Sequence, residues 1–177
     1  MAIITVGEPA IDRPSTTTVG RTSLDLLNAI PTNGVIHTFN VYLTSDSTNC
    51  YVGIFYLVSE TTYMCRSSAY VGNLNAGLQE ITGLSLVCEA GDYIGYYSQT
   101  GSLDRNDTGG QGASYSGNAC NQGSSYNFTT GERIYSLNAI GNTLSVITKM
   151  NGVNWEAISK INNLPKNNLN KINGITI

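Results

Sequence analysis

Few side chains of this protein have the types and spacing that catalysis needs. The only histidine, His37, shares strand parity with Val35 and Phe39 in the alternating segment 35–43, so we expect it in the core or at a strand end. A Ser-His-Asp triad would need a histidine placed as a base beside a nucleophile. Glycoside hydrolysis would need two carboxylates on one cleft, whereas the acidic residues here are scattered among turns. We therefore expect no catalytic residue and no enzymatic activity.

The best candidate for a metal site lies in the polar segment 104–110. Asp104, Asn106 and Asp107 can supply three oxygen ligands on one loop, which is the chemistry that Ca²⁺ prefers. The segment lacks the ligand order of an EF-hand, and Arg105 stands among the candidate ligands. A plain polar turn is the alternative to a calcium site, and no other cofactor is expected.

Tyrosines form a second candidate site. Tyr96 and Tyr97 lie on one predicted strand, while Tyr115 and Tyr126 lie near the two ends of a Gly-rich segment. Aromatic rings that carry a hydroxyl, placed beside Asn and Ser, suit adaptable contacts with proteins or sugars. We predict these four tyrosines as ligand-binding residues, with unliganded surface tyrosines as the alternative.

The four cysteines show no Cys-x-x-Cys spacing, so zinc is not expected. Cys50, Cys65 and Cys88 lie in predicted strands, where small buried hydrophobic side chains are the simplest interpretation. Cys120 lies in the Gly-rich segment and could pair with one of the others in an oxidising medium. Four cysteines allow three sets of pairs, and the sequence does not choose among them.

The composition indicates a surface built from uncharged polar residues. Of the 177 residues only 12% are charged, against about 25% in an ordinary soluble domain. In their place stand 17 Ser, 19 Thr, 20 Asn and 11 Tyr. A net charge of −3 without a basic run argues against nucleic acid as a partner, and no apolar stretch is long enough for a transmembrane helix. This composition is typical of a protein that is exposed outside a cell.

The first fifteen residues lack both the basic start and the apolar run of a secretory signal. Two routes then lead to an exterior location. Either a signal has been removed, or the protein leaves its cell as part of a particle that is released. The Met at the start slightly favours the second route.

Alternation of apolar and polar residues predicts short strands along residues 1–143. The clearest are 35–43, a hairpin of 50–58 with 63–71 turning at 59–62, and 93–97 after a turn at 89–92. About eight strands without a long amphipathic helix predict an all-β fold, an antiparallel β-sandwich of jelly-roll type. The segment 99–125 is expected to be a long surface loop with one short strand, 113–115, inside it.

The remaining residues, 144–177, repeat with a period of 11 in the segments 147–157, 158–168 and 169–177. The matching residues are Ile147, Ile158 and Leu169, then Lys149, Lys160 and Lys171, then Met150, Ile161 and Ile172, and finally Asn151, Asn162 and Asn173. All four lysines of the chain lie in this tail, which carries +3 against −6 on residues 1–143.

We expect each repeat to be a short helix followed by a turn, with Pro165 at a first helical position and Gly174 after a helix end. Such short helices are marginal alone and must pack against something. The predicted contact residues for docking on another subunit are Trp155, Ile158, Ile161, Leu164, Leu169 and Ile172. The alternative is a tail folded back on its own domain.

Three passages carry a resemblance to a known group of proteins: residues 4–13 (ITVGEPAIDR), 89–97 (EAGDYIGYY) and 155–162 (WEAISKIN). They resemble the jelly-roll structural proteins encoded by tailed bacteriophages and environmental viral genomes, whose chains often end in Ile-x-Lys-Ile-Asn-Gly repeats. The resemblance implies a location in the virion, and no catalytic residue transfers with it.

Composition, repeats and resemblance together predict a non-enzymatic virion structural protein that decorates a capsid or forms part of a head or tail appendage such as a fibre. Its expected partners are other virion proteins and copies of itself, with a homotrimer as the expected assembly. One alternative is a carbohydrate- or receptor-binding module that contacts a host surface glycan through the Tyr-rich strand and the segment 99–125. Another is the subunit of an extracellular filament.

Overall fold

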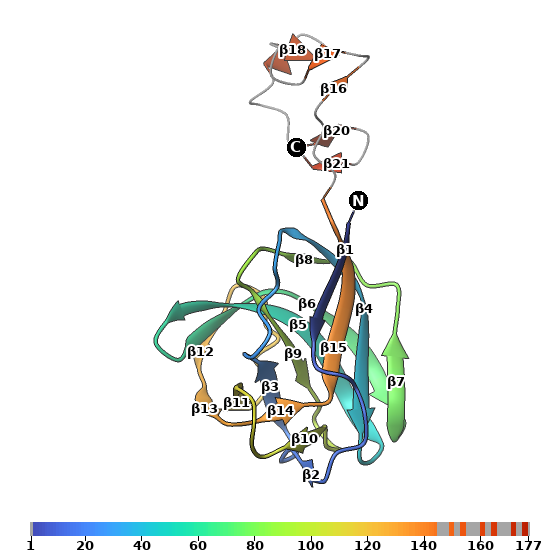
Figure 1. Cartoon of the computed structure of the whole chain (residues 1–177), viewed down its shortest axis with the longest axis vertical. Helices are drawn as coiled ribbons and strands as arrows, with labels where there is room; N and C mark the ends of the chain where they lie inside the picture. The colour runs from blue at the N-terminus through green and yellow to red at the C-terminus, as the bar shows by residue number, and fades with distance from the viewer. Residues whose placement is uncertain are drawn as a thin grey trace. The chain divides into compact units, whose positions relative to one another are not determined.

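The computed structural model describes residues 2–144 and, beyond them, six two-residue strands within 149–176 (Figure 1). The chain divides into two compact units, one of residues Ala2–Thr143 and one of Met1 with Leu144–Ile177. Every regular element among the described residues is a β-strand, and every ladder between named strands is antiparallel. The larger unit is called the body below.

One sheet of the body has five strands, because β4 pairs with two short strands along one of its edges. The order is β1 (Ile3–Gly7), β15 (Leu137–Thr143), β4 (Gly34–Leu43) and β7 (Gly77–Ile81), and β8 (Leu86–Cys88) pairs with the other half of β4. The first and last strands of the body, β1 and β15, are therefore neighbours, and they tie its two ends together.

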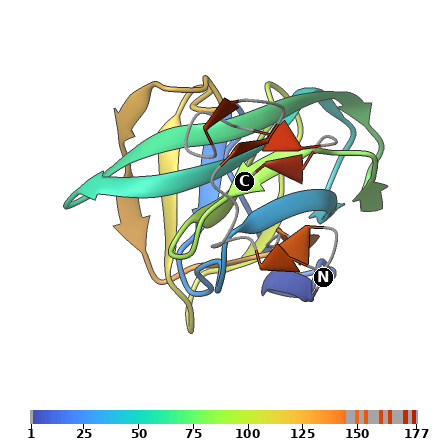
Figure 2. The same ribbon diagram turned by 90° about the horizontal axis from the view of Figure 1, so that it is seen from above.

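The second sheet has seven strands and curls toward closure. Its order is β12 (Ser125–Asn127), β6 (Thr62–Leu74), β5 (Ser47–Ser59), β9 (Tyr93–Tyr97), β3 (Arg21–Asp25), β11 (Gly112–Ser116) and β13 (Thr129–Gly131). Its two edge strands, β12 and β13, are separated in the chain by Phe128 alone. Because one residue spans only about 3.5 Å, the end of β12 lies next to the start of β13, and the sheet is nearly a barrel (Figures 1 and 2).

A small third sheet, in the order β14 (Ile134–Tyr135), β10 (Asp104–Asn106) and β2 (Ser15–Thr16), completes the body.

Successive residues of a strand face opposite sides, and this gives the body two cores. On β5 and β9, Val52, Ile54, Ile94 and Tyr96 face the five-stranded sheet. They belong to a buried cluster with Ile4, Val6, Ile36, Phe39, Val41, Leu43, Leu137 and others, which we call the inter-sheet core. The opposite face of the seven-stranded sheet carries a second buried cluster, the barrel core, which consists of Leu24, Phe55, Tyr63, Cys65, Ala113, Ala119, Cys120 and Phe128.

The Phe55 ring packs in the barrel core against two paired glycines, which carry no side chains. Gly53 on β5 pairs with Gly95 on β9. A methyl group on Gly53 would come within 2.9 Å of Cε2 of Phe55, and one on Gly95 within 2.8 Å of the same atom. The paired glycines therefore leave the space that the Phe55 ring fills.

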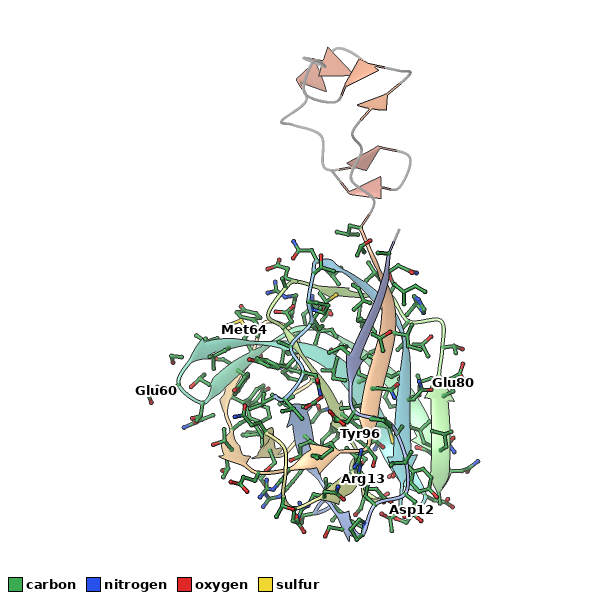
Figure 3. All side chains as sticks on the ribbon, in the orientation of Figure 1. Asp12, Arg13, Glu60, Met64, Glu80 and Tyr96 are labelled. Carbon is green, nitrogen blue, oxygen red and sulfur yellow. The ribbon has the colours of Figure 1, made fainter. Side chains whose placement is uncertain are left out.

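The structure confirms the β-sandwich-like, all-β body. The predicted strand 35–43, the hairpin turning at 59–62 and the strand 93–97 are present. Figure 3 shows Glu60 at the tip of that hairpin. The predicted parity of β4 is wrong at its start, however. Between β15 and β4 the register shifts so that His37 has no partner, a β-bulge that turns Ile36 into the core and leaves Val35 and His37 partly exposed.

The expectation for 99–125 is wrong in part. The short strand predicted at 113–115 is present as β11, but the segment also contributes β10 and buries Ala119 and Cys120 in the barrel core. Some of its glycines leave the space that neighbouring residues fill. A methyl group on Gly112, for example, would come within 2.6 Å of the Tyr135 ring.

Where the structure describes the repeats, they are strand pairs, so the predicted helices are wrong at these residues. β16 (Lys149–Met150) pairs with β17 (Val153–Asn154), β18 (Lys160–Ile161) with β19 (Leu164–Pro165), and β20 (Lys171–Ile172) with β21 (Ile175–Thr176). Asn-Gly separates the paired strands in the first and third repeats, and Asn-Asn in the second. Asn-Gly is the strongest short-range signal for a hairpin, whereas a helix of eight residues is marginal in water.

We predict that Gly95→Ala destabilises the body by about 1–3 kcal/mol, because the new methyl group would overlap Phe55 and Leu24 in a packed core. Gly131→Ala is the matched control, since its nearest neighbour would be Arg133 Cζ at 3.6 Å. We expect that change to stay within about 0.5 kcal/mol. Denaturant unfolding measures both variants, and equal midpoints for the two would contradict the packing described for Phe55.

Candidate binding surface

Three tyrosines form a row across three adjacent strands of the seven-stranded sheet. Tyr51 on β5 lies directly opposite Tyr70 on β6 and directly opposite Tyr97 on β9. The ring centroids of Tyr51 and Tyr70 are 5.1 Å apart, and those of Tyr51 and Tyr97 are 6.2 Å apart. We call Tyr70, Tyr51 and Tyr97 the tyrosine row.

Amide side chains border one end of the tyrosine row. The Tyr70 hydroxyl donates to Asn49 Oδ1 at 3.4 Å, and the Asn49 side-chain amide donates to Gln99 Oε1. The backbone N–H of Asn49 donates to Asn73 Oδ1 at 3.2 Å. We call Asn49, Asn73 and Gln99 the amide rim.

Two members of the tyrosine row pack beside the barrel core, and the third is exposed. Tyr51 and Tyr97 are half-buried and pack against the barrel core, whereas Tyr70 is 59% exposed. All three rim residues are exposed. None of the six residues carries a charge, and the ion pairs that the structure shows join other residues: Arg66 with Glu89 and Asp92, and Arg105 with Asp107.

The structure separates the four tyrosines predicted to bind a ligand. Tyr97 belongs to the tyrosine row. Tyr115 and Tyr126 form a separate pair with ring centroids 4.8 Å apart, and Tyr115 also packs against Phe128 at 5.7 Å, where the two edges of the seven-stranded sheet meet. Their close packing there gives both rings a structural role.

The prediction that Tyr96 binds a ligand is wrong. It is 1% exposed and its hydroxyl donates to Cys50 Sγ at 3.2 Å inside the inter-sheet core, so it cannot contact a ligand at the surface (Figure 3). Strand alternation is the reason, because Tyr96 and Tyr97 face opposite sides of β9.

Tyr51 and Tyr70 were not among the predicted site residues, although the sequence holds a signal for them. Ser59 pairs with Thr62 at the turn that the sequence predicts. Counting outward from that pair in simple antiparallel register brings Tyr51 opposite Tyr70, and the observed bulges restore the same register. The row is completed by β9, which only the tertiary structure places beside β5.

The candidate calcium ligands have different partners. Asp104 is buried, and its carboxylate accepts the backbone N–H of Arg13 at 3.2 Å and the Thr44 hydroxyl. Asp107 is exposed and pairs with Arg105 at 2.8 Å. Asn106 lies on β10, partly buried. Within the part of the chain that the structure describes, no group of three or more His, Cys, Asp or Glu side chains is arranged to hold a metal ion.

Three of the six predicted docking residues fall in the described strands of the tail. Ile161 pairs with Leu164, and Ile172 pairs with Ile175, each pair standing next to the two residues that separate the strands. Trp155, Ile158 and Leu169 lie outside the described residues.

The four cysteines are buried as free thiols in two separate places. Cys50 and Cys88 belong to the inter-sheet core, and Cys65 and Cys120 belong to the barrel core. This confirms that the strand cysteines are small buried side chains, and it extends the same role to Cys120. Burial raises the pKa of Cys65 and of Cys88 from 9.0 to about 11.

No protein-family model matches the chain, and no curated protein matches it. Among the described residues, no helix combines the length and apolar character that crossing a membrane requires.

We predict that the free energy of unfolding falls as the pH rises from 9 to 11. Unfolded thiols lose their protons near pH 9, whereas Cys65 and Cys88 in the folded body keep theirs until about pH 11, so the stabilisation is complete below pH 9 and is lost across this window. Denaturant unfolding at pH 8 and pH 10.5 measures the effect. A Cys65→Ala, Cys88→Ala double variant should show a smaller decrease, and an equal decrease would contradict this origin.

Proposed function

We propose that this chain is a non-enzymatic structural protein of a virus particle, exposed on a capsid or on a head or tail appendage, and that its body is a jelly roll. The strand order of the body is the observation that carries the proposal. One sheet has the order β1-β15-β4-β7, and the central strands of the other have the order β3-β9-β5-β6. Two interlocking Greek keys of eight strands produce this order, and jelly rolls of this kind build viral capsid and lectin domains.

The surface chemistry agrees with exposure outside a cell. Uncharged polar residues replace charged ones over the whole sequence, which is 12% charged. The lone histidine, His37, lies in the bulge of β4, and the candidate calcium ligand Asp104 binds Arg13 and Thr44. Both residues thus have structural positions, as the proposal of a scaffold requires.

The tail suits attachment to another subunit. Its three hairpins repeat one arrangement, in which Lys149, Lys160 and Lys171 occupy the same register position. An apolar pair stands next to each turn segment: Met150 with Val153, Ile161 with Leu164, and Ile172 with Ile175. Exposed ion pairs each contribute only about 0–1 kcal/mol, so the repeated apolar positions would supply most of the docking energy and the lysines the orientation toward an acidic body.

Light scattering after size exclusion tests the docking role. We expect a trimer for the full chain and a monomer for a chain that ends at Leu144, which keeps the bonds between Ala2 and Thr143 that close the body. A full chain in which Lys149, Lys160 and Lys171 are replaced by Ala separates the contribution of charge from that of the apolar residues. Equal masses for the full and shortened chains would contradict docking by the tail, and open-ended polymers would favour a filament subunit.

A location in the particle is tested directly. Particles released by the source culture and banded on a density gradient should contain the chain in many copies per particle, as quantitative mass spectrometry would show. Its presence only in the soluble fraction would contradict the virion role.

A further inference from the structure

We propose that the tyrosine row and the amide rim form a binding site for a neutral saccharide. This site is independent of the tail and gives the body a recognition function in addition to a structural one.

The geometry of the site favours a ligand made of several linked rings, such as an oligosaccharide. The row crosses three neighbouring strands, whose spacing is about 4.8 Å each, and the ring centroids follow that spacing at 5.1 and 6.2 Å. The rings are tilted against one another by 55° and 56°, so they form a stepped apolar surface. Such a surface can contact the C–H faces of successive sugar rings.

The polar groups of the rim match hydroxyl groups of the ligand. In the bonds that the structure shows, Gln99 and Asn73 use their side-chain oxygens as acceptors, which leaves their amide N–H groups to donate to a ligand. The Tyr70 hydroxyl points into the same network through Asn49. Aromatic surface beside a small number of placed polar groups is the usual composition of a site for a small organic ligand.

The backbone at the rim is held in an uncommon conformation. Asn49 has φ of 48°, in the left-handed region, and the register of β5 against β6 shifts between Ser47 and Cys50 and again between Cys50 and Tyr51. Strained positions of this kind occur preferentially at functional sites. Here the conformation sets the Asn49 amide between Tyr70 and Gln99. Since Tyr51 and Tyr97 are also fixed against the barrel core, the site is formed before a ligand arrives, which lowers the entropic cost of binding.

Size and charge favour a neutral saccharide over the other ligands considered. A stable protein–protein interface needs about 20–30 residues on each side, whereas six residues make up this site. The six carry no positive charge for a carboxylate, sulfate or phosphate group, and the body carries −6 overall. Acidic glycans would therefore be repelled, and neutral ones would not.

Ligand-observed NMR and calorimetry on the full chain test the proposal. The probes are oligosaccharides of mannan, galactan and dextran, with hyaluronan fragments as the acidic comparison. We expect at least one neutral oligosaccharide to bind and hyaluronan not to bind. Failure of every neutral probe, or preference for hyaluronan, would overturn the proposal without bearing on the virion role or on the tail.

Variants locate the site. Tyr70→Ala removes the most exposed ring and should weaken binding by at least about tenfold, as expected for an aromatic anchor, while Tyr70→Phe should keep most of the affinity. Gln99→Ala should weaken binding several-fold. Tyr42→Ala is the matched control, because this tyrosine lies on β4 in the other sheet and is half-exposed like Tyr51.

A one-dimensional methyl spectrum of each variant checks that it is folded. Unchanged affinity in folded Tyr70→Ala would overturn the assignment of the site, and so would a loss of binding in Tyr42→Ala equal to that in Tyr70→Ala.

Discussion

Closure of the seven-stranded sheet is the constraint on which the rest of the body depends. Phe128 alone joins the two edge strands, so the sheet must curl until its edges meet, and its concave side must then be filled. Phe128 packs edge-on to Phe55 and to Tyr63 with centroids 6.2 and 5.5 Å apart. The paired glycines under Phe55 let that ring lie against the backbone. The seven-stranded sheet thereby carries a buried cluster on each face, and Tyr51 and Tyr97 pack against the one that closure creates.

Three carboxylates of the body are buried, and two of them, Asp92 and Asp104, bind partners from distant parts of the chain. Asp92 is buried in the turn before β9 and accepts two bonds from Arg66, at 2.6 and 3.1 Å, while Arg66 also lies over the Tyr56 ring at 4.6 Å. Asp104 binds the backbone N–H of Arg13, and the Arg13 guanidinium donates to Ser136 at 2.9 Å. Removing one partner of such a buried pair would be costly, since it leaves a charge without compensation. These contacts hold together segments that are far apart in the chain.

The predictions that differ from the structure have two kinds of cause: some depend on contacts between distant strands, and others on patterns within a short segment. The alternation of β4 predicted a strand correctly, but the bulge at His37 depends on how β15 pairs with it, and no pattern within β4 reveals an extra residue. In the repeats, Pro165 and Gly174 suit a helix, but Asn-Gly between short β-formers favours a hairpin, so the sequence itself holds the signal for the strand pairs. Strand alternation likewise separates Tyr96 from Tyr97, because adjacent strand residues face opposite sides.

Composition and alternation along the chain were sufficient for an all-β body with a neutral polar exterior, for the hairpin that turns at residues 59–62, and for a separate lysine-bearing tail. These properties follow from the period of two in strands and from the kinds of residue available for a surface, both of which are local. The near-barrel and the place of Tyr97 in the tyrosine row were decided by the fold alone. Each brings together strands that are far apart in the chain, such as β3 with β11 and β5 with β9. Which strands become neighbours depends on the joint burial of two cores, and that is a property of the whole body.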